Sequence, residues 1–147
     1  MSLMEKLTAD MKEAMKQGEK ERLSVIRLVR GAVRQAEIDG KKILSDDEVI
    51  GVITKEVKMR RDSIEEFERG KRADLVKKAE EEIALLMPYL PSQLSIDEVK
   101  KIVEEAVAEV GATTAKDMGK VMGALMPRVK GRADGKLVNE IVRSILK

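Results

Sequence analysis

The sequence contains neither cysteine nor histidine among its 147 residues. Their absence excludes thiolate chemistry, catalytic triads built on histidine, and zinc sites with Cys and His ligands. The lack of cysteine also fits a reducing compartment. We therefore expect no metal and no cofactor, and any function has to use Lys, Arg, Asp, Glu, hydroxyl and backbone groups.

Aromatic residues make up only 1% of the chain, and proline occurs three times. Phe67 falls on a predicted core stripe and Tyr89 in a predicted linker, so neither forms a platform for stacked bases. Any RNA partner would then be recognised through its backbone and shape. The chain is instead rich in Ala, Leu, Met, Glu, Lys and Arg, and its regularly spaced apolar residues make up 43% of it, which argues against disorder. We predict an all-α protein.

Long hydrophobic runs are also missing. Charged residues interrupt every segment, so none reaches the length of a membrane span. The first charges, in Met1–Lys6, are not followed by the apolar stretch of a signal peptide. We expect a cytoplasmic protein that does not bind a membrane.

Helical periodicity predicts an N-terminal helical domain of four helices, at residues 3–16, 19–38, 45–68 and 73–87. Gly18 is the expected stop of the first helix, and residues 39–42 are the expected turn after the second. Ser45 and Glu48 have the spacing of a capping box, in which each side chain satisfies a free backbone N–H of the other residue. The fourth helix carries Glu80–Glu82 on its expected solvent face.

Two prolines, Pro88 and Pro91, mark the expected domain boundary, because proline cannot continue a helix. We predict domains at 1–90 and 91–147, the second with three helices. Their expected starts are the box Ser95/Glu98, the box-like Thr114/Asp117, and Asp134 as an N-cap. Pro127 is expected to stop the middle helix.

Positive charge is concentrated in the last part of the chain. Residues 1–90 have no net charge, residues 91–115 sum to −3, and residues 116–147 sum to +5. Such a local surplus attracts phosphate even in a nearly neutral protein. The expected RNA contacts lie on the two last helices and the turn between them: Lys116, Lys120, Arg128, Lys130, Arg132, Lys136, Asn139 and Arg143, with Lys147 on the same solvent face as the last three.

Four glycines accompany these cations. Gly119 and Gly123 lie inside a predicted helix, where glycine costs about 0.5–1 kcal/mol relative to alanine, so each requires a reason. Close packing of a neighbouring helix is the favoured reason, and close approach of a ligand is the alternative. Gly131 and Gly135 allow the turn to expose backbone N–H groups next to a helix N-terminus, which suits a phosphate. The competing interpretation is a solvated turn with ordinary surface lysines.

Arg27, Arg30 and Arg34 form a second basic feature, on one face of the second helix. They would bind phosphates or pair with acidic residues of the third or fourth helix. Internal pairing is favoured because residues 1–90 are charge-balanced. No two carboxylates are forced together on an apolar face, so we expect no catalytic residues.

Several segments carry a family resemblance: Tyr89–Leu94, Val110–Gly111, Asp117–Met126, Lys130–Gly135 and Leu137–Asn139. With them the chain resembles the YqeY-like proteins from end to end. Its C-terminal part resembles the tail domain found in one of the subunits of the glutamyl-/aspartyl-tRNA amidotransferase. The resemblance implies that the tail contacts tRNA, while amide chemistry resides in other domains and subunits. The contacts it implies are Lys120, Lys130, Arg132 and Lys136, with the four glycines setting backbone shape.

The sequence therefore predicts a non-catalytic, cytoplasmic accessory protein that binds tRNA or another structured RNA through its C-terminal domain. One alternative is a protein–protein interaction module in a translation-related complex. Another is a component of a carbon–nitrogen ligase that uses glutamine as amido-N-donor, a label that would be inherited by homology.

Overall fold

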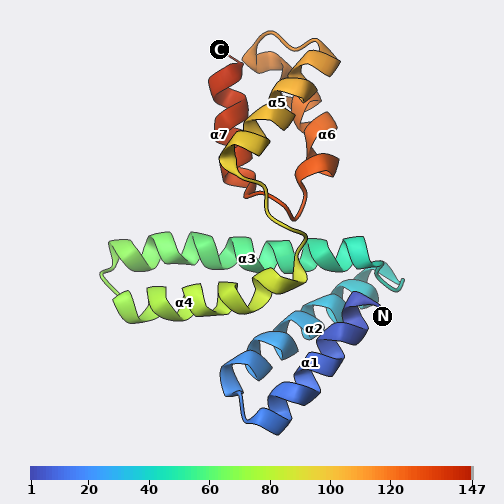
Figure 1. Ribbon diagram of the computed structural model, residues 1–147, viewed down its shortest axis with the longest axis vertical. Coiled ribbons are helices and arrows are strands. Elements are labelled where there is room, and N and C mark those ends of the chain that lie inside the picture. The colour runs from blue at the N-terminus through green and yellow to red at the C-terminus, as the bar shows by residue number, and fades with distance from the viewer. Residues whose placement is uncertain (147) are drawn as a thin grey trace. The chain divides into compact units, whose positions relative to one another are not determined.

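The computed structural model describes residues 1–146, and over that range it contains seven α-helices and no β-strand, which confirms the all-α prediction (Figure 1). The helices are α1 (Leu3–Gln17), α2 (Lys20–Gly40), α3 (Asp46–Arg69), α4 (Ala73–Leu86), α5 (Ile96–Val110), α6 (Met118–Val129) and α7 (Gly135–Ile145). Short 3-10 turns cover Met87–Tyr89 and Ala115–Asp117. In the described part of the chain, no helix is long and apolar enough to cross a membrane.

The chain divides into two compact units, Met1–Leu90 and a second that begins at Pro91. Each unit has its own cluster of buried apolar residues. The break falls between Leu90 and Pro91, where the 3-10 turn has ended and the chain is extended. Four of the seven helices belong to the first unit and three to the second.

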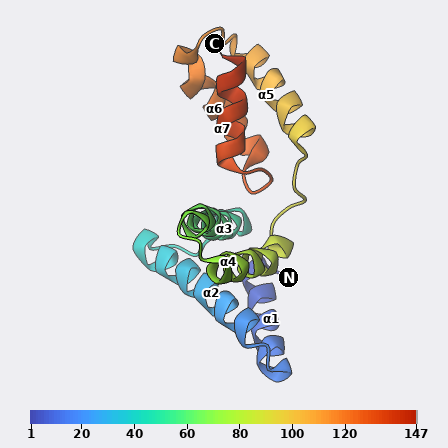
Figure 2. The ribbon, with the colours of Figure 1, turned by 90° about the vertical axis from the view of Figure 1, so that its left-hand side faces the viewer.

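The first unit consists of two helical hairpins, α1 with α2 and α3 with α4 (Figure 2). Gly18 ends α1 as predicted, in the left-handed conformation with φ of 68°. The capping box of Ser45 and Glu48 opens α3 as predicted. The expected turn at 39–42 begins too early, because α2 continues through Gly40. Lys41 then ends the helix in the left-handed conformation, with φ of 52°.

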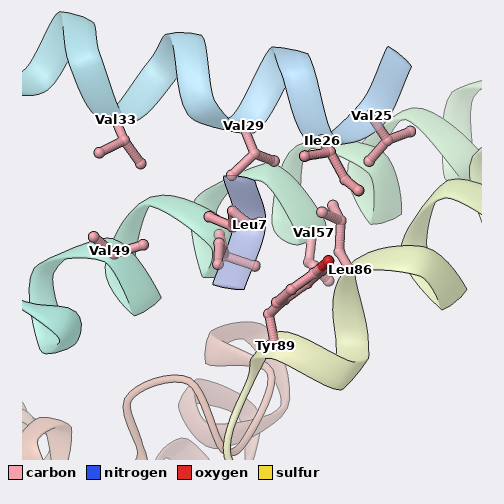
Figure 3. Packing of buried hydrophobic residues seen from close by; sticks show 10 residues of the cluster. Leu7, Val25, Ile26, Val29, Val33, Val49, Val57, Leu86 and Tyr89 are labelled. Carbon is pink, nitrogen blue, oxygen red and sulfur yellow. The ribbon is translucent and has the colours of Figure 1, made fainter. Parts of the chain in front are cut away.

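The core of the first unit consists of apolar side chains that its helices enclose. In Figure 3, valines from α2 project toward α3, and Leu86 and Tyr89 enter from the end of α4 and the turn after it. Tyr89, which the sequence places in the linker, is only 8% exposed and belongs to the core of the first unit. The buried set is Leu7, Val25, Ile26, Val29, Val33, Val49, Ile53, Val57, Leu86 and Tyr89.

One charged cluster lies between α3 and α4. Nε of Arg60 is 3.3 Å from Oε1 of Glu82, and Nη1 of Arg60 is 3.8 Å from Oε1 of Glu56. The Arg60 side chain is 12% exposed and that of Glu56 9%. Glu82 is therefore an ion-pair partner, and the expectation of a fully solvated face at Glu80–Glu82 is wrong for this residue.

In the second unit α5, α6 and α7 enclose a core of their own. The capping box of Ser95 and Glu98 opens α5, and Gly111 ends it in the left-handed conformation. Pro127 does not stop α6, which continues to Val129. The buried residues are Val99, Val103, Ala106, Val121, Leu125, Val129, Val138, Ile141, Val142 and Leu146.

Candidate nucleic-acid interface

The solvent side of α6 and its flanking turns carries three of the predicted cations. Lys116 lies in the 3-10 turn before the helix, Lys120 in its first turn, and Lys130 at its C-cap. All three are exposed, and none forms an ion pair with any residue the structure describes. Lys120 and Lys130 are ten positions apart, which is about 15 Å along a helix. We call this surface, with Gly119 and Gly123 between the lysines, the α6 ridge.

The two glycines of the α6 ridge do not serve internal packing. Both are exposed, and a Cβ atom added to Gly119 or Gly123 would meet no heavy atom within 4 Å beyond the helix's own neighbouring backbone. The favoured interpretation, close packing by a neighbouring helix, is therefore wrong. The two glycines leave a bare, exposed stretch of helix.

Pro127 adds an acceptor to the same ridge. Because proline has no N–H, it cannot donate to the carbonyl of Gly123 one turn earlier. That carbonyl lies next to an exposed Gly123, where no side chain covers the backbone. Met126 is 40% exposed on the same side of α6. The ridge thus combines exposed ammonium groups, a carbonyl without its usual helical donor, and a small apolar contact.

The turn after α6 is held in place by hydrogen bonds to the segment before α5. Gly131 is buried and has φ of 75°, and its carbonyl accepts a hydrogen bond of 2.8 Å from Nε2 of Gln93. The carbonyl of Arg132 accepts from the N–H of Leu94 at 2.8 Å, and Nε of Arg132 donates to the carbonyl of Ser92 at 3.3 Å. Arg132 therefore fixes the segment that leads into α5, in addition to carrying charge.

The N-terminus of α7 is already capped. Asp134 is the N-cap as predicted, and its Oδ1 accepts from the N–H of Lys136 at 3.1 Å. Gly135 is the first helical residue and is exposed, with no atom near the position of a Cβ. The carboxylate therefore occupies one of the backbone donors that the sequence predicts for phosphate. The Lys136 side chain is exposed.

Arg128 points its charge at α5. Its Nη2 lies 2.6 Å from Oε2 of Glu105, and this hydrogen bond holds the pKa of the Glu105 carboxyl below its ordinary value. At the other end of α6, the N–H groups of Thr113 and Thr114 donate to the carboxylate of Asp117 and lower its pKa. In the predicted box of Thr114 and Asp117, the Asp117 carboxylate is thus the acceptor for the backbone N–H groups.

On α7 the predicted contacts separate. Arg143 is exposed, but Asn139 is half-buried, and its Oδ1 is enclosed without a hydrogen-bond partner. The expectation that Asn139 shares the solvent face is therefore wrong. Lys147 lies outside the described residues. Among residues 1–146 there is also no group of three or more acidic side chains placed to hold a metal ion.

The structure thus sorts the eight predicted contacts into three sets. Lys116, Lys120 and Lys130 gather along the α6 ridge, while Lys136 and Arg143 are exposed on α7. The other three are engaged or enclosed: Arg128, Arg132 and Asn139. Met126 and the Gly123 carbonyl were missed, and the only sign of them in the sequence is the spacing of four between Gly123 and Pro127.

These features define an all-helical protein of two units, the second of which carries a lysine-flanked ridge. The chain belongs to the family of YqeY-like proteins, whose profile matches residues 4–146. It is 33% identical over 112 residues to "Altered inheritance of mitochondria protein 41, mitochondrial" of Pyrenophora tritici-repentis, a match that covers 73% of this chain and 62% of that protein.

Proteins of the same name in other fungi are also similar. The Saccharomyces cerevisiae protein is 31% identical over 112 residues, covering 71% of this chain and 60% of the relative. The Kluyveromyces lactis protein is 39% identical over 84 residues, covering 56% and 45%. The matches therefore span less than two thirds of each of these relatives.

Proposed function

We propose that this protein is a non-catalytic accessory protein that binds tRNA, or another structured RNA, through the α6 ridge. The observation that carries the proposal is the open space over Gly119 and Gly123. Two glycines inside a helix cost about 1–2 kcal/mol together relative to alanine. No internal contact accounts for that cost, whereas a sugar–phosphate backbone lying against the helix would.

The surrounding groups suit RNA. Lys116, Lys120 and Lys130 would neutralise phosphates without first breaking an ion pair of their own. The carbonyl of Gly123, which lacks its usual helical donor, would accept a hydrogen bond from a ribose 2′-hydroxyl, the group that distinguishes RNA from DNA. Because no aromatic platform accompanies these groups, we expect recognition of backbone and shape with little base specificity.

The remaining predicted residues have supporting roles in this proposal. Lys136 and Arg143 extend the cationic surface on α7. Arg128 and Arg132 would contribute charge only secondarily, because Glu105 and the Ser92 carbonyl already bind them. Resemblance to the amidotransferase tail favours tRNA as the partner. The carbon–nitrogen ligase activity belongs to that enzyme's other parts, and we do not extend it to this chain.

Filter binding of bulk tRNA to the full chain at about 50 mM and about 200 mM salt tests the proposal, because phosphate contacts release counterions. Changing Lys116, Lys120 and Lys130 together to alanine should weaken binding and reduce the slope of log K against log salt by about 2–3. The matched control changes Lys55, Lys77 and Lys78, which are exposed cations of the first unit. Absence of tRNA binding at low salt, or equal losses in the two triple variants, would contradict the proposal.

The proposed place of action is the cytoplasm. The names of the fungal relatives state a mitochondrial location for those proteins. Cell fractionation with an antibody against the full chain distinguishes the two locations.

A further inference from the structure

A second surface, on the first unit, is independent of the proposed RNA contacts. Arg27, Arg30 and Arg34 follow one another along a single face of α2. None of them forms an ion pair with any residue the structure describes, although the chain has 27 acidic residues. The favoured prediction, pairing with acidic residues of the third or fourth helix, is therefore wrong.

Two of the arginines instead lie against methionines of α1, the neighbouring helix of the hairpin (Figure 2). Nη1 of Arg30 is 3.2 Å from Sδ of Met11, and Nη2 of Arg27 is 4.0 Å from Sδ of Met15. A thioether is only a weak acceptor, so these contacts leave most of the guanidinium donors without a strong acceptor in the protein. Nε of Arg30 is buried without any hydrogen-bond partner.

Apolar side chains share this surface. Met15 is 53% exposed, and Ile38, one turn after Arg34, is 69% exposed. Gly31 lies between the arginines on the same face and has no neighbouring atom near the position of a Cβ. A hollow of about 410 Å³ continues the surface at the end of α2, lined by Arg34, Glu37, Ile38, Lys41, Lys42 and Ile43.

The only carboxylate in that hollow is engaged elsewhere. Oε2 of Glu37 accepts a hydrogen bond of 2.9 Å from the N–H of Leu44, which fastens the loop after α2. The surface therefore presents positive charge and apolar groups together. We call it the arginine–methionine strip and define it as Met11, Met15, Arg27, Arg30, Arg34 and Ile38.

We propose that the arginine–methionine strip docks an acidic amphipathic helix of a partner protein. Arg27 and Ile38 are eleven positions apart, so the strip is about 16 Å long and matches about three turns of a helix. Carboxylates one turn apart would complement the guanidinium groups, which bind carboxylates in a fixed fork geometry. Apolar side chains between them would cover Met11, Met15 and Ile38, and methionine adapts readily to such partners.

A nucleic acid fits this strip less well. Phosphates would meet the guanidinium groups but would leave Met15 and Ile38 exposed to water. The apolar contacts thus favour a peptide helix, which covers both kinds of group at once. The α6 ridge differs in degree, since bare backbone lies between its cations and Met126 is the single apolar contact assigned to it.

The probe is a fluorescent synthetic peptide of about 14 residues, designed as a helix with glutamates on one face and leucines beside them. Fluorescence anisotropy with the full chain should show binding that a peptide of the same composition in scrambled order does not. Changing Arg27 and Arg34 together to glutamate should weaken binding roughly tenfold or more. Both residues are exposed, so the fold should persist. Lys77 and Lys78 changed to glutamate provide the matched control and should leave affinity unchanged.

Three outcomes would overturn this proposal. One is equal binding of the designed and scrambled peptides, and another is unchanged affinity of the Arg27/Arg34 variant. The third is displacement of the peptide by bulk tRNA, which would make the strip a nucleic-acid surface. A result from sedimentation would also overturn it. If the chain self-associates and the Arg27/Arg34 variant does not, a second copy of the chain occupies the strip in place of a partner protein. Failure of tRNA binding at the α6 ridge has no bearing on these measurements.

Discussion

The hydroxyl of Tyr89 donates a hydrogen bond of 2.5 Å to Oδ2 of Asp10, a residue 79 positions earlier in the chain. The same carboxylate is 3.7 Å from Nη2 of Arg22 and 3.8 Å from Nζ of Lys6. The contact ties the turn after α4 to α1 and so closes the first unit just before Pro91. Burial, followed by the hydrogen bond to Asp10, raises the pKa of Tyr89 well above its ordinary value.

Tyr89 should therefore titrate abnormally. It is the only tyrosine, and there is no tryptophan, so the rise of tyrosinate absorbance near 295 nm reports on this residue alone. We expect the folded protein to show almost no tyrosinate at about pH 10–11, where a free tyrosine goes from about half to about nine-tenths ionised. Above about pH 10 the unfolded chain loses this proton first, so the free energy of unfolding should fall as the pH rises.

Changing Asp10 to asparagine provides the control for this titration. Removal of the negative charge should bring the apparent pKa of Tyr89 down, yet burial should keep it above that of free tyrosine. If Tyr89 of the folded, unsubstituted protein ionises at about pH 10, as a free tyrosine does, the contact with Asp10 is contradicted.

Changing Gly119 and Gly123 to alanine should stabilise the folded protein. Because a Cβ at either position meets open space, the double change should raise the free energy of unfolding by about 1–2 kcal/mol in urea denaturation. The same variant should bind bulk tRNA more weakly, since the added methyl groups hold a ligand away from the helix. Gly31→Ala on α2 is the matched control, equally open, and should gain stability with tRNA affinity unchanged.

Arg60 should be far more important to stability than the exposed arginines. Arg60→Met leaves Glu56 and Glu82 without their shared cation in a largely buried place, and we expect a loss of about 2–4 kcal/mol in urea denaturation. Adding Glu82→Gln should recover part of this loss. Arg72→Met, which removes an exposed pair with Asp74, should cost less than about 1 kcal/mol. Equal losses in the two single variants would be inconsistent with the cluster.

The domain boundary stays a prediction that separate expression decides. Residues 1–90 and 91–147, produced as two fragments, should each give a helical circular dichroism spectrum and a cooperative thermal transition, because each unit encloses its own core. The second fragment is short, and we expect it to have the lower transition temperature. A fragment that is unfolded alone but folds on addition of the other would show that the boundary does not separate independent domains.

Much of the fold follows from local patterns. The capping boxes at Ser45 and Ser95 and the stop at Gly18 were predictable because a helix end depends on residues within one turn of it. The box of Ser2 and Glu5 was missed, although the same spacing is present in the sequence. Pro127 was misjudged because a proline near the end of a helix removes one hydrogen bond without ending the helix.

The sequence by itself thus determined the helices, their order and the surplus of positive charge near the end of the chain, since these depend on neighbouring residues and composition. Only the tertiary structure decided what each charged or small residue faces. It turned Gly119 and Gly123 toward solvent, engaged Arg132 with Ser92, and left Arg30 against Met11. These contacts depend on which helices and turns lie side by side. Helical periodicity predicts which residues share a face of one helix, but it does not predict which element packs against that face.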